Sequence, residues 1–202
     1  MGARCERAVG LAFDAYIRGD SSGVLLVEQL DERVNRDEVA LHALILRILA
    51  LRQPLGEDLR FLATALRLII DLERIGDEAI NIAERVVPRD GEAKSRVGGE
   101  LVAMAGAARD MLQESLDAFV DADAEAAEHV LGRDDAVDRA CANVIAAMIE
   151  HMSQDPGEVP AGLRVVGVAK YLERIADHAT NVAEQVIFMV RGDDVRHGRW
   201  RR

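Results

Sequence analysis

Residues 71–87 read DLERIGDEAINIAERVV, and residues 171–187 read YLERIADHATNVAEQVI. The second stretch lies one hundred positions after the first, and ten of the 17 aligned positions are identical. Similarity at a fixed interval is the signature of a repeated structural unit. The chain is therefore predicted to be a tandem duplication whose halves share one plan.

Each copy of this stretch has two distinct faces when it is placed on an α-helix at about 100° per residue. Isoleucine, valine and alanine side chains gather on one face, which is the pattern of a helix that packs on a core. The opposite face carries the same four polar residues in both copies: Glu73, Asp77, Asn81 and Glu84, then Glu173, Asp177, Asn181 and Glu184. The carboxylates are therefore expected to line an outward-facing groove or ridge.

A row of acidic residues on a helix is commonly no more than a solvated face. Like charges four residues apart destabilise a helix by roughly 0.2–0.5 kcal/mol per pair, however, and both diverged copies keep this arrangement. A bound cation would offset the repulsion. Carboxylate oxygens suit Mg, Ca, Mn and iron, so the repeated row favours a metal site.

Composition indicates an all-α protein with an aliphatic core, because half of the 202 residues are hydrophobic while aromatic residues make up 3%. Turn signals divide the chain into six predicted helices: 1–18, 23–52, 57–87, 92–120, 124–152 (irregular at Gly132) and 161–191. The predicted architecture is two tandem three-helix bundles. The first bundle is expected over 1–88, the second over 91–192, and a basic, disordered tail over 193–202.

The net charge of −11 argues against nucleic-acid binding, since contacts with phosphates need a basic surface. No apolar run approaches the roughly 18 residues of a membrane span, and no signal peptide opens the chain. Cys5 and Cys141 have no CxxC spacing, which fits buried thiols in a reducing compartment. The protein is expected to be soluble and cytoplasmic, and to meet a membrane only through a partner.

The two copies do not begin alike. Tyr16–Asp20 aligns with Phe119–Asp123 at an interval of 103, so Met1 aligns with Met104 and residues 92–103 have no counterpart. Either the first helix is shorter in the first copy, or the chain given starts downstream of its natural start. In the second case the first bundle is expected to carry an uncovered apolar stripe.

A second pair of polar residues lies four positions apart on the second helix of each copy. These are Asp31 and Asn35 in the first copy and Asp134 and Asp138 in the second. If the second and third helices of each copy are antiparallel neighbours, the two polar rows face one groove and form an oxygen-rich multi-metal site. The predicted ligands are Asp31, Asn35, Glu73, Asp77 and Glu84 in the first copy, and Asp134, Asp138, Glu173, Asp177 and Glu184 in the second.

Other site types are not indicated. A ferritin-like di-iron site needs Glu-x-x-His, which does not occur in the chain, and there is no P-loop, GxSxG or HExxH. His178 is expected to flank the second site, and His42 and His129 to lie at the surface. No nucleophile is paired with a base, so no enzyme is predicted.

The segments Leu72–Glu84 and Tyr171–Glu184 resemble the paired signatures of the PhoU family, which are bacterial regulators of phosphate uptake. The resemblance extends to Asp31–Asn35, Arg52-Gln53-Pro54, Asp134–Asp138 and Phe188–Gly192. It implies two three-helix bundles in tandem, with multinuclear clusters of iron, zinc or lighter divalent ions such as Mg or Mn. The implied motifs are Glu73/Asp77, Glu173/Asp177, Asp134/Asp138 and the imperfect Asp31/Asn35.

The resemblance further implies a non-enzymatic adaptor that acts with the ATPase of the phosphate ABC transporter and with a membrane sensor histidine kinase. Such a protein represses phosphate-starvation signalling when phosphate is plentiful, and it is expected to be a homodimer. Two alternatives remain open at this stage. One is a metal-binding, storage or metal-dependent helical protein unrelated to phosphate signalling, and the other is a scaffold whose acidic rows only solvate it.

Overall fold

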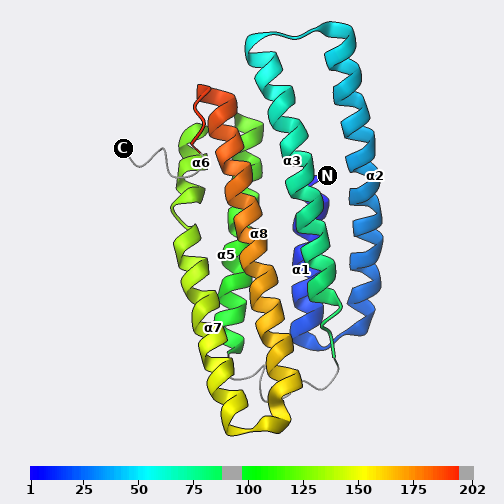
Figure 1. The fold of residues 1–202 in the computed structure, drawn as a ribbon. Helices are drawn as coiled ribbons and strands as arrows, with labels where there is room; N and C mark the ends of the chain where they lie inside the picture. Colours follow the sequence, from blue (N-terminus) through cyan, green and yellow to red (C-terminus); the bar gives the residue numbers. More distant parts are fainter. Residues whose placement is uncertain (88–96, 196–202) are drawn as a thin grey trace.

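The computed structural model describes residues 1–87 and 97–195, and helices follow one another along both ranges (Figure 1). The first bundle contains α1 (Gly2–Arg18), α2 (Ser21–Arg52) and α3 (Gly56–Ala83). The second contains α5 (Gly98–Asp121), α6 (Ala124–Leu131), α7 (Asp134–Gln154), the single 3-10 turn η1 (Pro156–Glu158) and α8 (Val159–Arg191). These two ranges contain no strand, so the predicted all-α fold of two tandem three-helix bundles is confirmed.

The two bundles lie side by side, with α3 packed on α8 at the junction and α1 in contact with α5 (Figure 1). The outer edges are formed by α2 on one side and by α6 and α7 on the other. One continuous core of buried side chains runs through both bundles, from Ala8 and Ile75 in the first to Leu112 and Val182 in the second. The apolar faces read from the repeat are therefore the faces that form this core.

The turn between the first and second helices is built alike in both copies. Gly19 ends α1 in the left-handed conformation with a φ of 65°, and Asp20 then caps α2 by accepting from the backbone N–H of Ser22. Ala122 ends α5 at a φ of 51°, and Asp123 caps α6. Aspartate is a favoured N-cap because its carboxylate accepts from the free N–H groups of the first turn.

The helix predicted over 124–152 with an irregularity at Gly132 is divided at that glycine into α6 and α7. Leu30 of the first copy is buried in the core, whereas the aligned residue in the second copy is Arg133, which pairs with Glu114 and Asp110 of α5. Gly132, which has a low helix propensity, precedes it. The chain therefore turns Arg133 out of the core, and Asp134 becomes the first residue of α7.

The remaining helix boundaries follow the prediction with small shifts. The start of the fourth predicted helix at residue 92 lies outside the described residues, and α5 begins at Gly98. Gly192 ends α8 with a φ of 79°, as expected for a C-cap glycine. Just beyond it, Val195 is buried against the core, although the tail was expected to be disordered from residue 193. The rest of that tail, 196–202, lies outside the described residues.

Three further features bear on function. Cys5 and Cys141 are free and buried, as predicted, and the Cys5 thiol donates to the carbonyl of Leu72 at 3.2 Å. Over the described ranges, no helix combines the length and apolar character that crossing a membrane requires. The hairpin of α2 and α3 extends past the start of α1, so part of its apolar face is not covered by described residues (Figure 1).

Candidate metal sites

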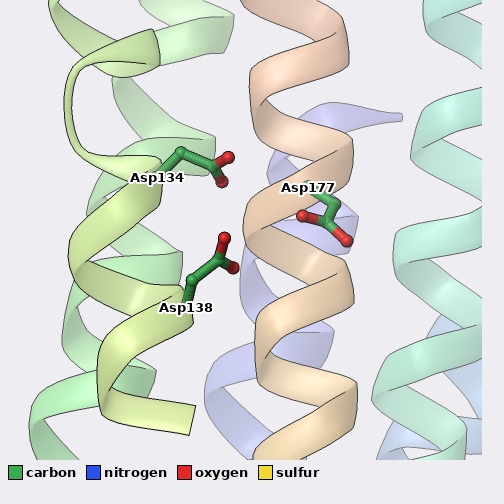
Figure 2. A group of neighbouring side chains, drawn as sticks. All are labelled: Asp134, Asp138 and Asp177. Atoms are coloured by element: carbon green, nitrogen blue, oxygen red, sulfur yellow. The ribbon is translucent and has the colours of Figure 1, made fainter. Parts of the chain in front are cut away.

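Three aspartates of the second bundle form the tightest acidic group of the described residues. Asp134 and Asp138 lie one turn apart on α7, and Asp177 lies on α8. One carboxylate oxygen from each residue lies within 4.8 Å of the other two. Figure 2 shows Asp134 and Asp138 pointing from α7 toward α8, where Asp177 stands at the same level. The sequence prediction that the two polar rows share one groove thus agrees with the arrangement of these three residues.

The charges of this group are poorly compensated. Burial raises the pKa of Asp134 to about 6, and the neighbouring carboxylates Asp138 and Asp177 add to the rise. Burial also raises the pKa of Asp177, and Glu173 and Asp138 raise it further. A proton or a cation is therefore favoured between α7 and α8, because either would relieve both the burial of charge and the repulsion.

Glu173 lies one turn before Asp177 on α8, and it has a cation of its own. Both of its carboxylate oxygens accept hydrogen bonds from Lys170 Nζ, at 2.7 and 2.9 Å. The hydrogen bond to Glu173 raises the pKa of Lys170. The aligned residue of the first copy is Ile70, so this internal counter-ion belongs to the second bundle. The sequence prediction missed Lys170, although its spacing of three from Glu173 on a helix was a usable signal.

The first bundle brings four of its predicted ligands, Asp31, Asn35, Glu73 and Asp77, together between α2 and α3. Asn35 Nδ2 donates to Asp31 Oδ2 at 3.1 Å. Burial raises the pKa of Asp31, and the carboxylate of Asp77 on α3 raises it further. Burial and Asp77 also raise the pKa of Glu73, with a smaller contribution from Glu38. Glu38 was not in the predicted set, but it lies on the same face of α2 as Asp31.

The two sites share one further feature. Asp31 Oδ1 and Asp134 Oδ1, which align at an interval of 103, are buried and accept no hydrogen bond. A buried carboxylate oxygen without a partner is costly, and such atoms call for an explanation. A divalent cation provides one, because Mg, Ca and Mn are bound by carboxylate oxygens. The residues present therefore fit an oxygen-coordinated cation in each bundle.

Glu84 and Glu184 stand apart from these groups. Each lies seven residues after Asp77 or Asp177, which is about 10 Å along a helix. Glu84 is exposed just beyond the end of α3, and Glu184 is half-buried on α8. Neither is among the groups that shift the pKa of Asp31, Glu73, Asp134 or Asp177. Their role as ligands stays a prediction.

His178 lies beside the second site, at the junction of the bundles. Its Nδ1 is 2.9 Å from Asp71 Oδ1, and Asn181 Nδ2 donates to the same oxygen at 3.2 Å. Nearby, Arg174 donates to Glu78 at 3.3 Å. These contacts join α8 to α3 and place His178 outside the aspartate triad, as predicted. His42 is exposed on α2, and His129 lies 3.4 Å from Glu114 at the surface.

The sequence is similar to a known protein family and to named relatives. The family model described as the PhoU domain matches residues 1–86 and again 101–186. A phosphate-specific transport system accessory protein PhoU homolog from Pseudomonas aeruginosa is 39% identical over 198 residues, which are 98% of this chain and 82% of that relative. A homolog of the same name from Clostridium acetobutylicum is 31% identical over 196 residues, which are 96% of this chain and 90% of that relative.

Solved structures give the same result for the fold. The crystal structure of PhoU from Pseudomonas aeruginosa matches with a TM-score of 0.89 at 35% identity, covering 96% of this chain and 93% of that one. The crystal structure of the phosphate transport system regulatory protein PhoU from Streptococcus pneumoniae matches with a TM-score of 0.87 at 26% identity, covering 96% and 91%. The similarity spans both bundles and both acidic sites.

Proposed function

Since the chain belongs to the PhoU family, we propose that it is an accessory protein of a phosphate transport system and that it regulates phosphate uptake without catalysing a reaction. The observation that carries the proposal is the 39% identity to an accessory protein of that name over 98% of this chain. The family model matches both halves, so the whole duplication supports the assignment. The candidate sites offer carboxylate and amide oxygens, which are suitable ligands for a hard divalent cation.

The regulatory part of the proposal concerns two partners. The protein would act as an adaptor between the ATPase of a phosphate ABC transporter and a membrane sensor histidine kinase, and would reduce the starvation response when phosphate is plentiful. It would work in the cytoplasm, as a homodimer, and reach the membrane through these partners. The net charge of −11 supports an electrostatic component, because an acidic surface attracts basic partner surfaces in a salt-dependent way.

The acidic sites would hold divalent cations, iron, zinc or Mg and Mn, at equivalent places in the two bundles. The unpartnered oxygens of Asp31 and Asp134 support this assignment. A cation there would supply positive charge between α2 and α3 and between α7 and α8. The residues of this chain would hold those helix pairs in register around it and present the remaining acidic surface to partners.

The experiment that tests the function is alkaline phosphatase activity in phosphate-rich cells that lack this gene. The deletion is complemented with the wild type or with the double variant Asp77→Asn plus Asp177→Asn, and the amount of each protein is measured. The proposal expects high activity in the deletion, low activity with the wild type, and high activity with the double variant. Low activity in the deletion would contradict the regulatory role. If the wild type and the double variant both restored low activity, the acidic sites would not be needed for that role.

A metal-dependent protein unrelated to phosphate signalling is the competing function. The same aspartates would serve it, since oxygen ligands and bound cations also support hydrolysis. Turnover of a phosphate monoester by the metal-loaded protein, lost in Asp177→Asn, would favour that alternative. The adaptor proposal expects no turnover above the metal-free control.

A further inference from the structure

The two candidate cation sites differ most around the glutamate of each acidic row, a part of the site that we call its glutamate end. In the first bundle the glutamate end contains Glu73 of α3 and the half-buried Glu38 of α2. Burial and the charge of Asp77 raise the pKa of Glu73 most, and Glu38 raises it further. Two carboxylates therefore stand near each other at the glutamate end of the first site.

The glutamate end of the second site pairs one carboxylate with an ammonium. Cys141 aligns with Glu38 at the interval of 103, and Lys170 aligns with Ile70 at the interval of 100. Lys170 Nζ donates to both carboxylate oxygens of Glu173, at 2.7 and 2.9 Å. The hydrogen bond to Glu173 raises the pKa of Lys170 most, and Cys141 of α7 raises it further, so the ammonium lies between α7 and α8.

The first bundle offers its glutamates a weaker counter-ion. Among the described residues, the cation in ion-pair range of Glu73 is Arg74, whose Nε lies 3.7 Å from Glu73 Oε2 and whose side chain is 61% exposed. Such an exposed ion pair stabilises little, because water screens it. The place that corresponds to Lys170 is taken by Ile70, which is 51% exposed. The charges of Glu38 and Glu73 are therefore poorly compensated within the described residues.

The other carboxylates lie around the aspartates of each site, at what we call its aspartate end. In the second bundle Asp134, Asp138 and Asp177 gather there, with one oxygen of each within 4.8 Å of the other two (Figure 2). In the first bundle Asp31 and Asp77 lie there, and burial and then Asp77 raise the pKa of Asp31. Negative charge is thus concentrated at one end of the second site and spread over both ends of the first. The charge of the ligands tunes the affinity of an oxygen site for a divalent cation.

We propose that the first bundle binds one more divalent cation than the second, held between Glu38 and Glu73, and that the ammonium of Lys170 replaces this cation in the second bundle. The proposal rests on the cation sites of the proposed function. It adds to them a different number of ions in each bundle and a role for two residues, Glu38 and Lys170. In the second bundle the three aspartates hold one cation, and the ion pair of Lys170 with Glu173 neutralises the glutamate end without metal.

The test counts Mn²⁺ in one bundle at a time, by equilibrium dialysis of the tag-free full chain. Glu173→Gln plus Asp177→Asn disables the second site, and Glu73→Gln plus Asp77→Asn disables the first, so each double variant reports on the other bundle. EPR spectroscopy gives an independent readout, because two Mn²⁺ ions in one site are magnetically coupled and lose the hyperfine pattern of an isolated ion. We expect two ions with a coupled spectrum in the first bundle, and one ion with the isolated pattern in the second.

Exchanging residues between the glutamate ends should exchange these results. In the first bundle, Glu38→Ser plus Ile70→Lys is expected to remove one ion and restore the isolated pattern. In the second bundle, Lys170→Ile is expected to tighten Mn²⁺ binding about tenfold, since a positive charge beside the site is lost. Lys170→Arg keeps the charge, and Arg109→Ile removes an exposed cation of α5 instead, so each should change the affinity less than about twofold. Thermal unfolding of each metal-free variant confirms that it is folded.

Two results would overturn the inference and leave the cation sites of the proposed function in place. One is an equal number of ions in the two bundles, and the other is an equal effect of Lys170→Ile and Arg109→Ile. If neither bundle bound Mn²⁺, the cation sites would be contradicted together with the inference. The phosphatase test of the regulatory role does not depend on the number of ions, so it is decided separately.

Discussion

Asn35 Nδ2 donates a hydrogen bond of 3.1 Å to Asp31 Oδ2, at the place where the second bundle sets Asp138 beside Asp134. The amide satisfies one oxygen of Asp31 and adds no charge, whereas Asp138 adds a negative charge to an already crowded group. The two sites therefore share a plan but differ in charge at three places: here, at Glu38, which aligns with Cys141, and at Lys170, which aligns with Ile70. At this position the first site offers a divalent cation an amide where the second offers a carboxylate.

The substitution Asn35→Asp should make the first site resemble the second. The added carboxylate is expected to raise the affinity of the first bundle for Mn²⁺ about tenfold, because ligand charge tunes the affinity of oxygen sites. It should also lower the stability of the metal-free protein by about 0.5 kcal/mol, since it replaces a hydrogen bond with a repulsion. Isothermal titration with Mn²⁺ and thermal unfolding measure the two effects. An unchanged Mn²⁺ affinity would show that Asn35 does not face the cation.

Removing one charge from each site should separate the two binding events. Asp177→Asn is expected to abolish binding in the second bundle and leave the first, while Asp77→Asn is expected to do the reverse. Equilibrium dialysis of tag-free protein against Mn²⁺ or Fe²⁺ counts the ions bound. Glu28→Gln, which neutralises an exposed acid of α2, is the control for net charge. If the double variant Asp77→Asn plus Asp177→Asn bound as many ions as the wild type, the proposed cation sites of both bundles would be contradicted.

The pKa of Asp134, about 6 in the folded protein against an ordinary value of 3.8, predicts a pH-dependent gain from Asp134→Asn. A carboxyl with a raised pKa binds its proton more tightly when folded, so it destabilises the fold above pH 6 and ceases to do so as the pH falls toward 4. In metal-free protein, Asp134→Asn should raise the free energy of unfolding by about 1 kcal/mol at pH 7, after allowance for solvent screening. At pH 4 it should raise it little. Denaturant unfolding at both values, with Glu28→Gln alongside, measures this gain. If the variant were more stable by the same amount at both pH values, the raised pKa of Asp134 would be contradicted.

Much of this architecture was predictable because it depends on local spacing. The apolar and acidic faces of residues 71–87 and 171–187 follow from helical periodicity alone, and so do the pairs Asp31/Asn35 and Asp134/Asp138. The break before Asp134 was predicted from Gly132, but the ion pairs of Arg133 with Glu114 and Asp110 were not, because these two residues lie on another helix. The contact of His178 with Asp71 likewise joins residues 107 positions apart, and no local pattern indicates it.

The two copies of the first turn predict a stabilising substitution. Gly19 and Ala122 end α1 and α5 at φ values of 65° and 51°, a region that glycine adopts without strain and alanine does not. Ala122→Gly is expected to stabilise the protein by about 0.5–1 kcal/mol, and Gly19→Ala to destabilise it by a similar amount. Thermal unfolding of the two variants measures these opposite shifts. Destabilisation by Ala122→Gly would mean that the Ala122 methyl group makes contacts worth more than the backbone strain.

The junction of the bundles should depend on Asp71, since this carboxylate lies 2.9 Å from His178 Nδ1 and accepts from Asn181 at 3.2 Å. Asp71→Ala leaves both partners without their acceptor at a part-buried contact between α3 and α8, so a loss of about 1–2 kcal/mol is expected. A double-mutant cycle with His178→Ala isolates the pair, and a coupling of at least about 0.5 kcal/mol is expected for residues in direct contact. Additive losses would show that the two side chains meet without stabilising the junction, which would then rest on the apolar packing of α3 against α8.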